Sequence, residues 1–266
     1  MVQWFEVEFW KIAVFLDDDI VIFSNTFEEH LAHLEALFAR CRKANLQLHP
    51  GKLALCQSET KYLGFIVSAE GVRPDPAKTA PIRQFPRPTD KKAVRRFLGI
   101  GSYYRRFIKG FALVAQPLQR LVPESATFEW GEEQERAFKN LKAALTAPTF
   151  MAHPRPGLPY VIDCDAAMEG LGAVLSQKVG GQERPICYAS RVLRPNERKW
   201  SATELEAFAV VWALDTFRVY VEGSPALVRT DHSPLLWLRN NAGKSARIAR
   251  WVLRLQDFAF DLQHRA

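Results

Sequence analysis

Three consecutive aspartates stand between two apolar segments near the start of the chain. Residues 15–24 read FLDDDIVIFS, and the apolar residues on either side are enough for two short strands. Burying three neighbouring carboxylates costs several kcal/mol for each one unless something pairs with it. The stretch therefore predicts two short strands that are joined by an acidic turn.

The size and composition of the chain are those of a globular protein of about two domains. Of its 266 residues, 48% are apolar and 24% are charged, which is ordinary for such proteins. The longest apolar run, AFAVVWAL at 207–214, is too short to span a bilayer. The N-terminal residues MVQWFEVEFWK lack the basic start and the apolar stretch of a signal peptide.

The cysteines argue against a zinc site and against a disulfide framework. Cys41, Cys56, Cys164 and Cys187 form no CxxC pair. We therefore expect reduced thiols, a location in the cytoplasm or the nucleus, and no membrane partner. The sequence does not indicate a protein partner.

The positive charge of the chain is concentrated in one segment. The whole chain has a net charge of +7, whereas residues 73–109 alone contain eleven Lys and Arg against two acidic residues, a net charge of +9. The rest of the chain is therefore slightly acidic. A concentrated basic segment indicates a polyanionic partner more strongly than a uniformly high isoelectric point does.

Hydrophobic spacing predicts the main elements. Residues 26–44 have apolar residues at helical spacing, with Thr26 and Glu29 in a capping-box pattern. Residues 61–72 predict a hairpin that turns near Glu70 and Gly71, and five prolines between 74 and 88 predict a stiff connector. A basic aromatic helix and an amphipathic helix that ends at Pro148 follow. From Tyr160 the pattern is strand, strand, helix, strand, helix, and a last strand at 258–262.

Eight sequence blocks resemble one known family, in the family's order, between residues 14 and 251. They are FLDDDIVIFSNTFEEHLAHL, KYLGFIVSAEGV, RRFLGIGSYYRRFI, FEWGEEQERAFKNLK, DCDAAMEGLGAVLSQ, YASRVL, SATELEAFAVVWAL and VRTDHSPLLWL. Together they resemble the Pol polyproteins of gypsy-class LTR retrotransposons. The resemblance implies an α+β or α/β multidomain fold, with a partial reverse transcriptase before an RNase H-like mixed sheet flanked by helices.

The resemblance also implies the domain boundaries. We expect a palm remnant at 1–72, a basic thumb-like segment at 73–125, a connection helix at 126–150 and a C-terminally truncated RNase H-like domain at 151–266. Residues 1–13 resemble no block of the family. The parent activities would be RNA-directed DNA polymerase and ribonuclease H.

The three aspartates align with the polymerase motif of the family, which has two aspartates in a palm hairpin. Alignment on the downstream strand makes Asp18 and Asp19 the pair, whereas alignment on the upstream residues makes it Asp17 and Asp18. Either alignment leaves one residue too many, which a bulge must absorb unless one strand turns over. The chain also lacks the family's earlier palm aspartate and the fingers, so we interpret the motif as a relic without polymerase activity.

A second set of carboxylates matches the RNase H metal ligands of the family, which are Asp165, Glu206 and Asp231. Asp165 follows a strand pattern, Glu206 lies in an apolar helix that Ser201 and Glu204 cap, and Asp231 follows another strand pattern. Asp163 is the alternative to Asp165, because it lies on the same face of the strand. The family adds a fourth aspartate beyond the position of Ala266.

The resemblance implies a site for two Mg²⁺ or Mn²⁺ ions. Magnesium prefers oxygen ligands, and two ions about 3.5–4 Å apart can activate a water and stabilise the leaving oxygen. We expect hydrolysis of the RNA strand of RNA–DNA hybrids. The alternative is a non-catalytic remnant of a retroelement that only binds nucleic acid.

The basic segment resembles the thumb helices that contact a template–primer duplex. Basic side chains give phosphate affinity without sequence preference, and aromatic rings pack on sugars or bases. We expect contacts with a hybrid or duplex from Lys92, Arg95, Arg96, Tyr103, Tyr104, Arg105 and Arg106. His232 is interpreted as a structural residue or a substrate contact and not as a metal ligand.

Overall fold

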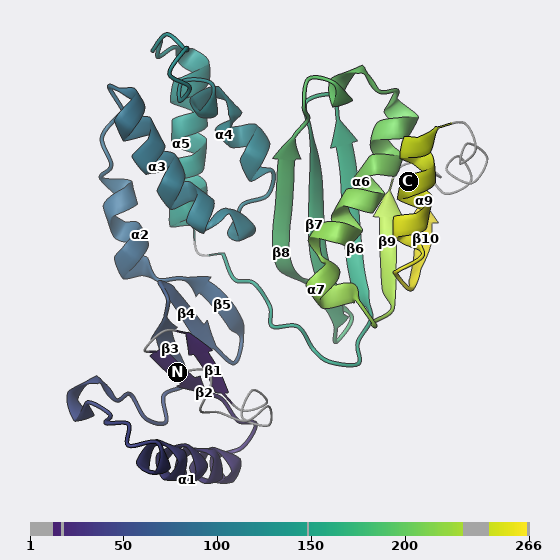
Figure 1. The fold of residues 1–266 in the computed structure, drawn as a ribbon. Coiled ribbons are helices and arrows are strands. Elements are labelled where there is room, and N and C mark those ends of the chain that lie inside the picture. Colours follow the sequence, from purple (N-terminus) through teal and green to yellow (C-terminus); the bar gives the residue numbers. More distant parts are fainter. Residues whose placement is uncertain (1–12, 17–18, 148, 231–244, 265–266) are drawn as a thin grey trace. The chain divides into compact units, whose positions relative to one another are not determined.

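The computed structural model describes residues 13–16, 19–147, 149–230 and 245–264 (Figure 1). The chain divides into two compact units, Met1–Ala69 and Glu70–Ala266. Within the described residues, no helix has both the length and the apolar character needed to cross a membrane.

The first unit begins with the expected hairpin. Strand β1 (Ala13–Leu16) pairs antiparallel with β2 (Asp19–Ile22), and Leu16 lies opposite Asp19. Helix α1 (Phe27–Lys43) follows, then the short helix η3 (Pro50–Lys52) and the antiparallel strands β3 (Glu59–Tyr62) and β4 (Phe65–Ser68). Leu63 and Gly64 turn between β3 and β4 with positive φ angles, a turn that the sequence pattern does not predict.

Helix α1 begins where the sequence predicts. The Thr26 hydroxyl accepts a hydrogen bond from the Glu29 amide at 3.2 Å, and the Glu29 carboxylate accepts one from the Asn25 amide at 3.1 Å. The buried face of α1 contributes Leu37 and Cys41 to a small core with Ala13 of β1. The cap satisfies amide groups that the first turn of a helix leaves without partners.

The second unit begins with strand β5 (Gly71–Pro74) and four helices. These are α2 (Pro76–Arg83), α3 (Lys91–Tyr103), α4 (Phe111–Gln119) and α5 (Glu132–Thr146), with η4 (Arg105–Phe107) between α3 and α4. Phe97, Leu118 and Leu141 are fully buried among these helices. The amphipathic pattern of α5 and its end before Pro148 are as the sequence predicts.

The proline-rich connector contains a short helix, α2, which the sequence pattern does not predict. Asp75 caps α2 by accepting a hydrogen bond from the Ala77 amide at 2.9 Å, and Pro76 occupies the first helical position. A proline there has the φ angle of a helix and loses no hydrogen bond. Pro81 lies inside this short helix.

The RNase H-like part of the second unit is a five-stranded mixed sheet. Its strand order is β10-β9-β6-β7-β8. The strands are β6 (Tyr160–Ala167), β7 (Gly170–Val179), β8 (Gln182–Val192), β9 (Ala226–Thr230) and β10 (Phe260–His264). β9 runs parallel to both β6 and β10, whereas β7 is antiparallel to β6 and β8.

Strand β8 is absent from the predicted pattern, which has only two strands before the first helix. Near its start the strand has the charged residues Glu183 and Arg184 followed by Pro185, a pattern that is not typical of a strand. β8 lies at the edge of the sheet, and the register with β7 shifts between Leu175 and Ser176, beside Pro185. Edge strands and bulges are the positions where a sheet tolerates proline.

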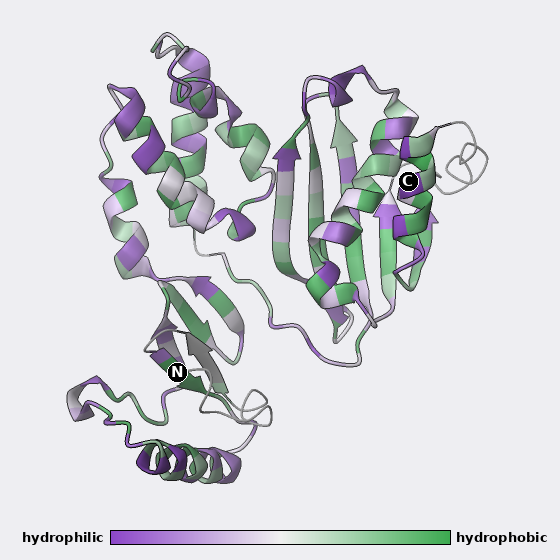
Figure 2. Ribbon diagram, in the orientation of Figure 1, coloured by the Kyte–Doolittle hydropathy of each residue, from purple (hydrophilic) through white to green (hydrophobic). Residues whose placement is uncertain are grey.

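Helix α6 (Ala202–Thr216) packs on the sheet against β6, β7 and β9 and buries residues on nearly all sides. The short helices η5 (Glu197–Lys199) and α7 (Arg218–Val221) flank it, and α9 (Ala246–Leu255) packs beside it. Strands β6, β7 and β9 are mostly hydrophobic (Figure 2). A large cluster of buried apolar residues lies between this sheet and α6.

Helix α4 packs against strand β8 and joins the helical part of the second unit to the sheet. The Ser190 hydroxyl of β8 accepts a hydrogen bond from the Ala112 amide at 2.8 Å. Gly170 lies under α4, and a Cβ atom there would be 2.7 Å from a methyl carbon of Leu113 and 2.5 Å from the Arg191 carbonyl oxygen. This close approach therefore requires glycine.

Candidate active site and nucleic-acid interface

Strand β6 places Asp165 two residues before the end of the strand. Cys164 points into the core on the side of α6, so alternation places Asp163 and Asp165 on the opposite face of the strand. Asp165 is exposed and lies opposite Gly172 of β7. A Cβ atom at Gly172 would have no neighbour within 4 Å among the described residues. The space beside Asp165 is therefore open to ions or substrate.

Asp163, the alternative to Asp165, lies in a network with Arg229 of β9. The Arg229 guanidinium donates to both carboxylate oxygens of Asp163, at 2.8 and 2.6 Å, and to both of Glu183, at 2.7 Å each. The hydrogen bond to Glu183 makes the largest contribution to the raised pKa of Arg229, and the hydrogen bond to Asp163 raises this pKa further. Asp163 and Arg229 are also opposite each other in the β6–β9 register.

Helix α6 carries Glu206 close to its N-terminus. The Ser201 hydroxyl accepts a hydrogen bond from the Glu204 amide at 3.3 Å, and the Glu204 carboxylate accepts one from the Ser201 amide at 3.0 Å. This capping box is the one that the sequence predicts. Glu206 is only 6% exposed, and the Thr230 hydroxyl donates to its Oε2 at 3.2 Å.

Asp231 and His232 lie outside the described residues. Asp231 directly follows Thr230, the last residue of β9, and Thr230 contacts Glu206. Within the described part of the chain, no three metal-binding side chains gather in one cluster. The described carboxylates, Asp165 and Glu206, are carried by β6 and by the helix that packs on the sheet. The alternation of β6 places Asp165 on the face away from α6, so the described residues do not bring these two carboxylates together. Their oxygens have the ligand chemistry that magnesium prefers.

The polymerase-motif residues are only partly described. Asp19 is exposed and begins β2, whereas Asp17 and Asp18 occupy the two positions between the strands and lie outside the described residues. The four residue pairs of the hairpin follow one another without a register shift. Ala13 of β1 packs with Leu37 and Cys41 of α1, so the helix supports the hairpin at the end away from the turn.

The basic residues of α3 form one exposed face. The Asp90 carboxylate caps the helix by accepting from the Ala93 amide at 2.7 Å. Lys92, Arg95, Arg96 and Tyr103 recur at helical spacing and are all exposed, while Val94 and Phe97 point into the core. We call the exposed side chains of Lys92, Arg95, Arg96 and Tyr103, together with exposed Arg105, the α3 basic face.

Members of this segment differ in their contacts. Arg95 forms an ion pair with Glu124, which lowers the pKa of that carboxylate, and Arg95 also donates to the Val122 carbonyl at 3.0 Å. The Arg96 guanidinium lies 5.3 Å from the centroid of the Phe85 ring. The side chains of Lys92 and Arg105 make no hydrogen bond or ion pair with the residues that the structure describes.

Tyr104 and Arg106 are not on this exposed face. Tyr104 is 5% exposed, so its ring belongs to the core and is not presented for stacking on a base. Burial raises the pKa of Tyr220 on α7, and half-buried Arg106 partly offsets that rise. The sequence places both residues in the basic segment, but α3 ends at Tyr103 and the following turn of η4 points them inward.

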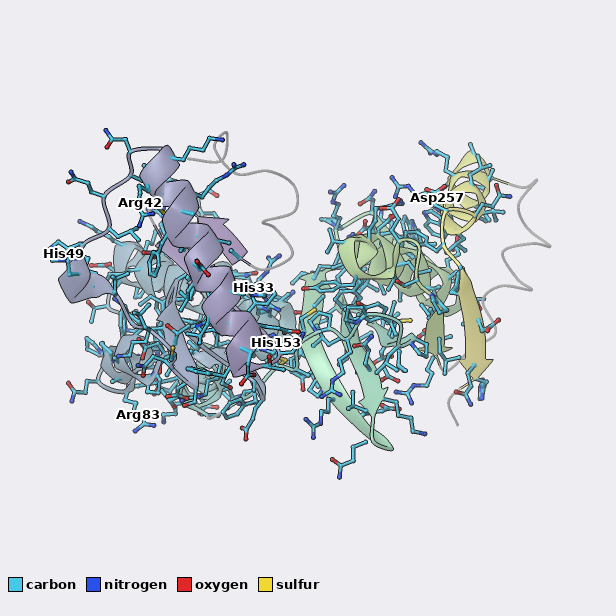
Figure 3. The ribbon with its side chains drawn as sticks, turned by 90° about the horizontal axis from the view of Figure 1, so that it is seen from below. His33, Arg42, His49, Arg83, His153 and Asp257 are labelled. Carbon is cyan, nitrogen blue, oxygen red and sulfur yellow. The ribbon has the colours of Figure 1, made fainter. Side chains whose placement is uncertain are left out.

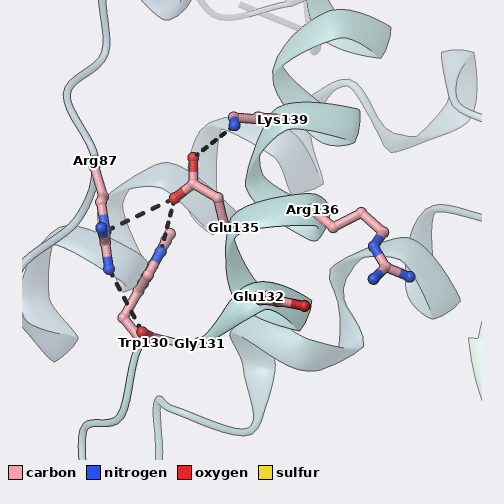
Figure 4. A pocket seen from close by; sticks show the side chains of 7 residues that line it. All are labelled: Arg87, Trp130, Gly131, Glu132, Glu135, Arg136 and Lys139. Atoms are coloured by element: carbon pink, nitrogen blue, oxygen red, sulfur yellow. Dashed lines mark hydrogen bonds and ion pairs between the residues drawn. The ribbon is translucent and has the colours of Figure 1, made fainter.

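Two further features of the structure involve none of the candidate metal ligands. A shallow surface pocket surrounds Trp130 beside α5, where Trp130 Nε1 donates to Glu135 at 2.9 Å and Arg87 packs 5.3 Å from the Trp130 ring centroid (Figure 4). In the first unit, His33 of α1 (Figure 3) lies 2.7 Å from the Ser24 hydroxyl through its Nδ1 atom. The pocket shares no residue with the candidate metal site.

Sequence reasoning missed two residues beside these carboxylates, Arg229 and Thr230. Both residues directly precede Asp231 in the sequence VRTDH, and of these residues only Asp231 is predicted to be a metal ligand. The alternation of β9 offers a signal, since Thr230 shares its face with the apolar Ala226 and Val228. A hydroxyl on such a face needs a hydrogen-bond partner.

Two family models match the chain. Residues 5–67 match the reverse transcriptase (RNA-dependent DNA polymerase) family, and residues 155–258 match the RNase H-like domain found in reverse transcriptase. The first match begins at residue 5, which corrects the expectation that residues 1–13 resemble no block of the family. The second match contains Asp165, Glu206 and Asp231.

The similar proteins are polyproteins of transposons. The Pol polyproteins of the Drosophila melanogaster transposons 412 and opus are 36% and 34% identical, over 93% and 96% of this chain. The Tf2-3 polyprotein of Schizosaccharomyces pombe is 30% identical over 93% of this chain. The chain spans 20%, 27% and 19% of the lengths of these three relatives.

Solved structures share the fold. A foamy viral protease–reverse transcriptase with double-stranded DNA has a TM-score of 0.85 at 24% identity, covering 97% of this chain and 47% of that one. A second, with an RNA/DNA hybrid, has a TM-score of 0.82 at 23% identity, covering 95% and 35%. The family matches and the transposon relatives identify the chain as a member of the gypsy-class LTR-retrotransposon Pol family, with a reverse transcriptase segment before an RNase H-like domain.

Proposed function

We propose that this chain hydrolyses the RNA strand of RNA–DNA hybrids in a reaction that depends on a divalent metal. The observation that carries the proposal is Glu206, a carboxylate buried at the start of α6 and held by the last residue of the strand that leads to Asp231. The matched RNase H-like family and the relatives' Pol polyproteins support the same activity.

Asp165, Glu206 and Asp231 would hold the metal ions. Bound there, Mg²⁺ or Mn²⁺ would supply an activated water and stabilise the leaving O3′ oxygen, which becomes the 3′-hydroxyl of one RNA fragment. Asp165 is the better candidate than Asp163, because Asp163 already binds Arg229 through both oxygens. The open space beside Gly172 supports access of the hybrid to Asp165.

The chain's own residues would orient the substrate through the RNA backbone. The α3 basic face provides charges for phosphates without reading the sequence. The 2′-hydroxyl distinguishes the RNA strand from DNA, so single DNA strands and DNA duplexes should bind without being cleaved. Two solved structures of similar fold hold double-stranded DNA and an RNA/DNA hybrid, which supports a duplex as the partner.

The test is a cleavage assay with a hybrid whose RNA strand carries a label. The 266-residue chain is incubated with Mg²⁺ or Mn²⁺ beside Asp165→Asn and a matched control, Asp261→Asn on exposed β10. We expect 5′-phosphorylated RNA fragments from the wild type and from Asp261→Asn, and none from Asp165→Asn. Asp165→Asn should stay folded, because removing one carboxylate near another relieves repulsion in the metal-free protein.

A non-catalytic duplex-binding protein is the second candidate function. The exposed α3 basic face favours it, because phosphate binding needs no metal ligands. Fluorescence anisotropy with a labelled hybrid separates the two candidates. Equal tight binding by wild type and Asp165→Asn, with no cleavage by either folded protein, would favour the binding function over hydrolysis.

A further inference from the structure

We propose that Thr230 is a positioning residue that fixes the carboxylate of Glu206 for metal binding. The inference rests on the proposed function, since it assigns a role to a neighbour of a candidate metal ligand. Thr230 Oγ1 donates to Glu206 Oε2 at 3.2 Å, and the two residues are only 1% and 6% exposed. The bond therefore lies in the protein interior, where water does not compete for either group.

The position of Thr230 in the sheet shows that the hydroxyl is unusual there. Ala226 and Val228 of the same strand point into the core on the α6 side, and Thr230 follows them in the alternation. Valine has the shape of threonine without its hydroxyl, so valine would fill this site as Val228 does. Burying a hydroxyl is unfavourable unless it is hydrogen-bonded, and the bond to Glu206 meets that requirement.

The backbone around Thr230 holds its hydroxyl in one place. β9 is an inner strand, paired with β6 on one side and with β10 on the other. Thr230 itself is paired in register with His264 of β10. Threonine is β-branched, so its χ1 rotation is restricted. A donor that is fixed by both backbone and rotamer limits the orientations of the Glu206 carboxylate.

Such a bond would have a direct effect on metal affinity. Some residues do not bind the metal themselves but hydrogen-bond a metal ligand and orient it. Mutation of such a residue typically lowers metal affinity about 10–100-fold. Glu206 belongs to α6, whereas Thr230 ends the strand that leads to Asp231 in sequence. The bond therefore links the helix that carries one candidate ligand to the strand that leads to another.

The test compares two substitutions at one position with a matched control. Thr230→Val keeps the shape and removes the donor, whereas Thr230→Ser keeps the donor and removes a methyl group. The control is Thr79→Val, because Thr79 is also a buried threonine with a hydroxyl bond, to the Asp75 carbonyl at 3.4 Å, on helix α2. Binding of Mn²⁺ alone to the 266-residue chain is measured by titration calorimetry, and thermal unfolding without metal is measured in parallel.

We expect Thr230→Val to weaken Mn²⁺ binding about 10–100-fold and Thr230→Ser to bind within about threefold of wild type. Thr79→Val should bind as wild type does. Equal Mn²⁺ affinity of wild type and Thr230→Val would overturn the inference while leaving the proposed function in place. Equal weakening by Val and Ser would also overturn it, because the methyl packing and not the donor would then be responsible.

The same titration separates failure of the inference from failure of the proposed function. Asp165→Asn is titrated beside wild type, because loss of a proposed ligand must weaken binding. If the folded wild type and Asp165→Asn show the same negligible Mn²⁺ binding, the proposed function fails and the positioning role fails with it. If wild type binds and Asp165→Asn does not, the Thr230 variants alone decide the inference.

Discussion

Asp163 and Asp165 are two candidate metal ligands on strand β6, and Asp163 forms an ion pair with Arg229 of β9. Their spacing of two places both side chains on one face of β6, so periodicity leaves the choice of metal ligand open. The structure adds the ion pair with Arg229, which lies 66 residues later in the chain. The sequence contains no local signal for this pair, because the pairing of β6 with β9 depends on the whole sheet.

The ion pair of Asp163 with Arg229 should stabilise the sheet. The two side chains are 21% and 20% exposed, between the surface pairs that contribute little and the buried pairs whose loss is costly. We expect Asp163→Asn to lower the free energy of unfolding by about 1–3 kcal/mol, because Arg229 would keep its charge with one carboxylate partner fewer. Urea unfolding of the variant measures the effect.

The matched control for this experiment is Asp261→Asn, an exposed aspartate on the neighbouring strand β10. It should change the free energy of unfolding by less than about 0.5 kcal/mol, as ordinary surface substitutions do. An effect of Asp163→Asn no larger than that of Asp261→Asn would contradict a stabilising role of the pair.

At the scale of elements, strong periodicity and caps make α1, α5 and α6 predictable. Thr26 and Ser201 accept hydrogen bonds from amides of the first helical turn, as their sequence contexts indicate. Strand β8 and helix α2 are not predicted, because proline normally interrupts both kinds of element. The edge position of β8 and the N-terminal position of Pro76 remove that conflict, and neither is visible before the fold is known.

The α3 basic face should account for the salt dependence of duplex binding. Replacing Lys92 and Arg105 by alanine should weaken binding to a hybrid and reduce the slope of log K against log salt by about one for each phosphate that the variant no longer binds. Both side chains are exposed, so their removal should not disturb the core. Fluorescence anisotropy over a series of salt concentrations gives the slope.

Two controls sharpen this measurement. Arg42→Ala removes an exposed charge from α1 (Figure 3) and should leave the slope unchanged. Arg106→Ala should lower thermal stability more than it changes the slope, because Arg106 is half-buried and does not belong to the α3 basic face. A slope that is the same for wild type and for the Lys92 and Arg105 double variant would identify these residues as a solvated surface only.

At the scale of the whole molecule, the sequence indicates both families but does not predict how the basic helices pack on the RNase H-like sheet. The order of the motifs follows the relatives over more than nine-tenths of the chain. The division into Met1–Ala69 and Glu70–Ala266 places the basic helices with the RNase H-like sheet and not with the palm segment. That association depends on α4 packing on β8, which no periodicity predicts.

The 266-residue polypeptide should not carry out template-directed DNA synthesis. Nucleotide addition needs metal ions that contact both the attacking and the leaving oxygens. These residues include the three consecutive aspartates but not the earlier palm aspartate or the fingers of the family. Primer extension on a poly(rA) template with Mg²⁺ or Mn²⁺ tests this expectation. Product that disappears in Asp18→Asn or Asp19→Asn would contradict it.

The last prediction concerns Glu70–Ala266 as one cooperative unit. Gly170 lies where α4 meets the sheet, and a Cβ atom there would approach the Arg191 carbonyl oxygen to 2.5 Å and Leu113 to 2.7 Å. Backbone cannot move aside as a flexible side chain does, so Gly170→Ala should destabilise the protein by about 1–3 kcal/mol. Gly172→Ala is the matched control on the same strand, because open space surrounds its Cβ position.

The probes of this experiment decide whether the helices and the sheet unfold together. Trp130 precedes α5, and Trp251 lies on α9 beside the sheet, so single-tryptophan variants report on each part separately. If α4 couples the two parts, Gly170→Ala should lower both transition midpoints by the same amount, since a two-state unit has one midpoint for every probe. Two separate midpoints, with only one of them sensitive to Gly170→Ala, would show that the helices and the sheet are independent domains.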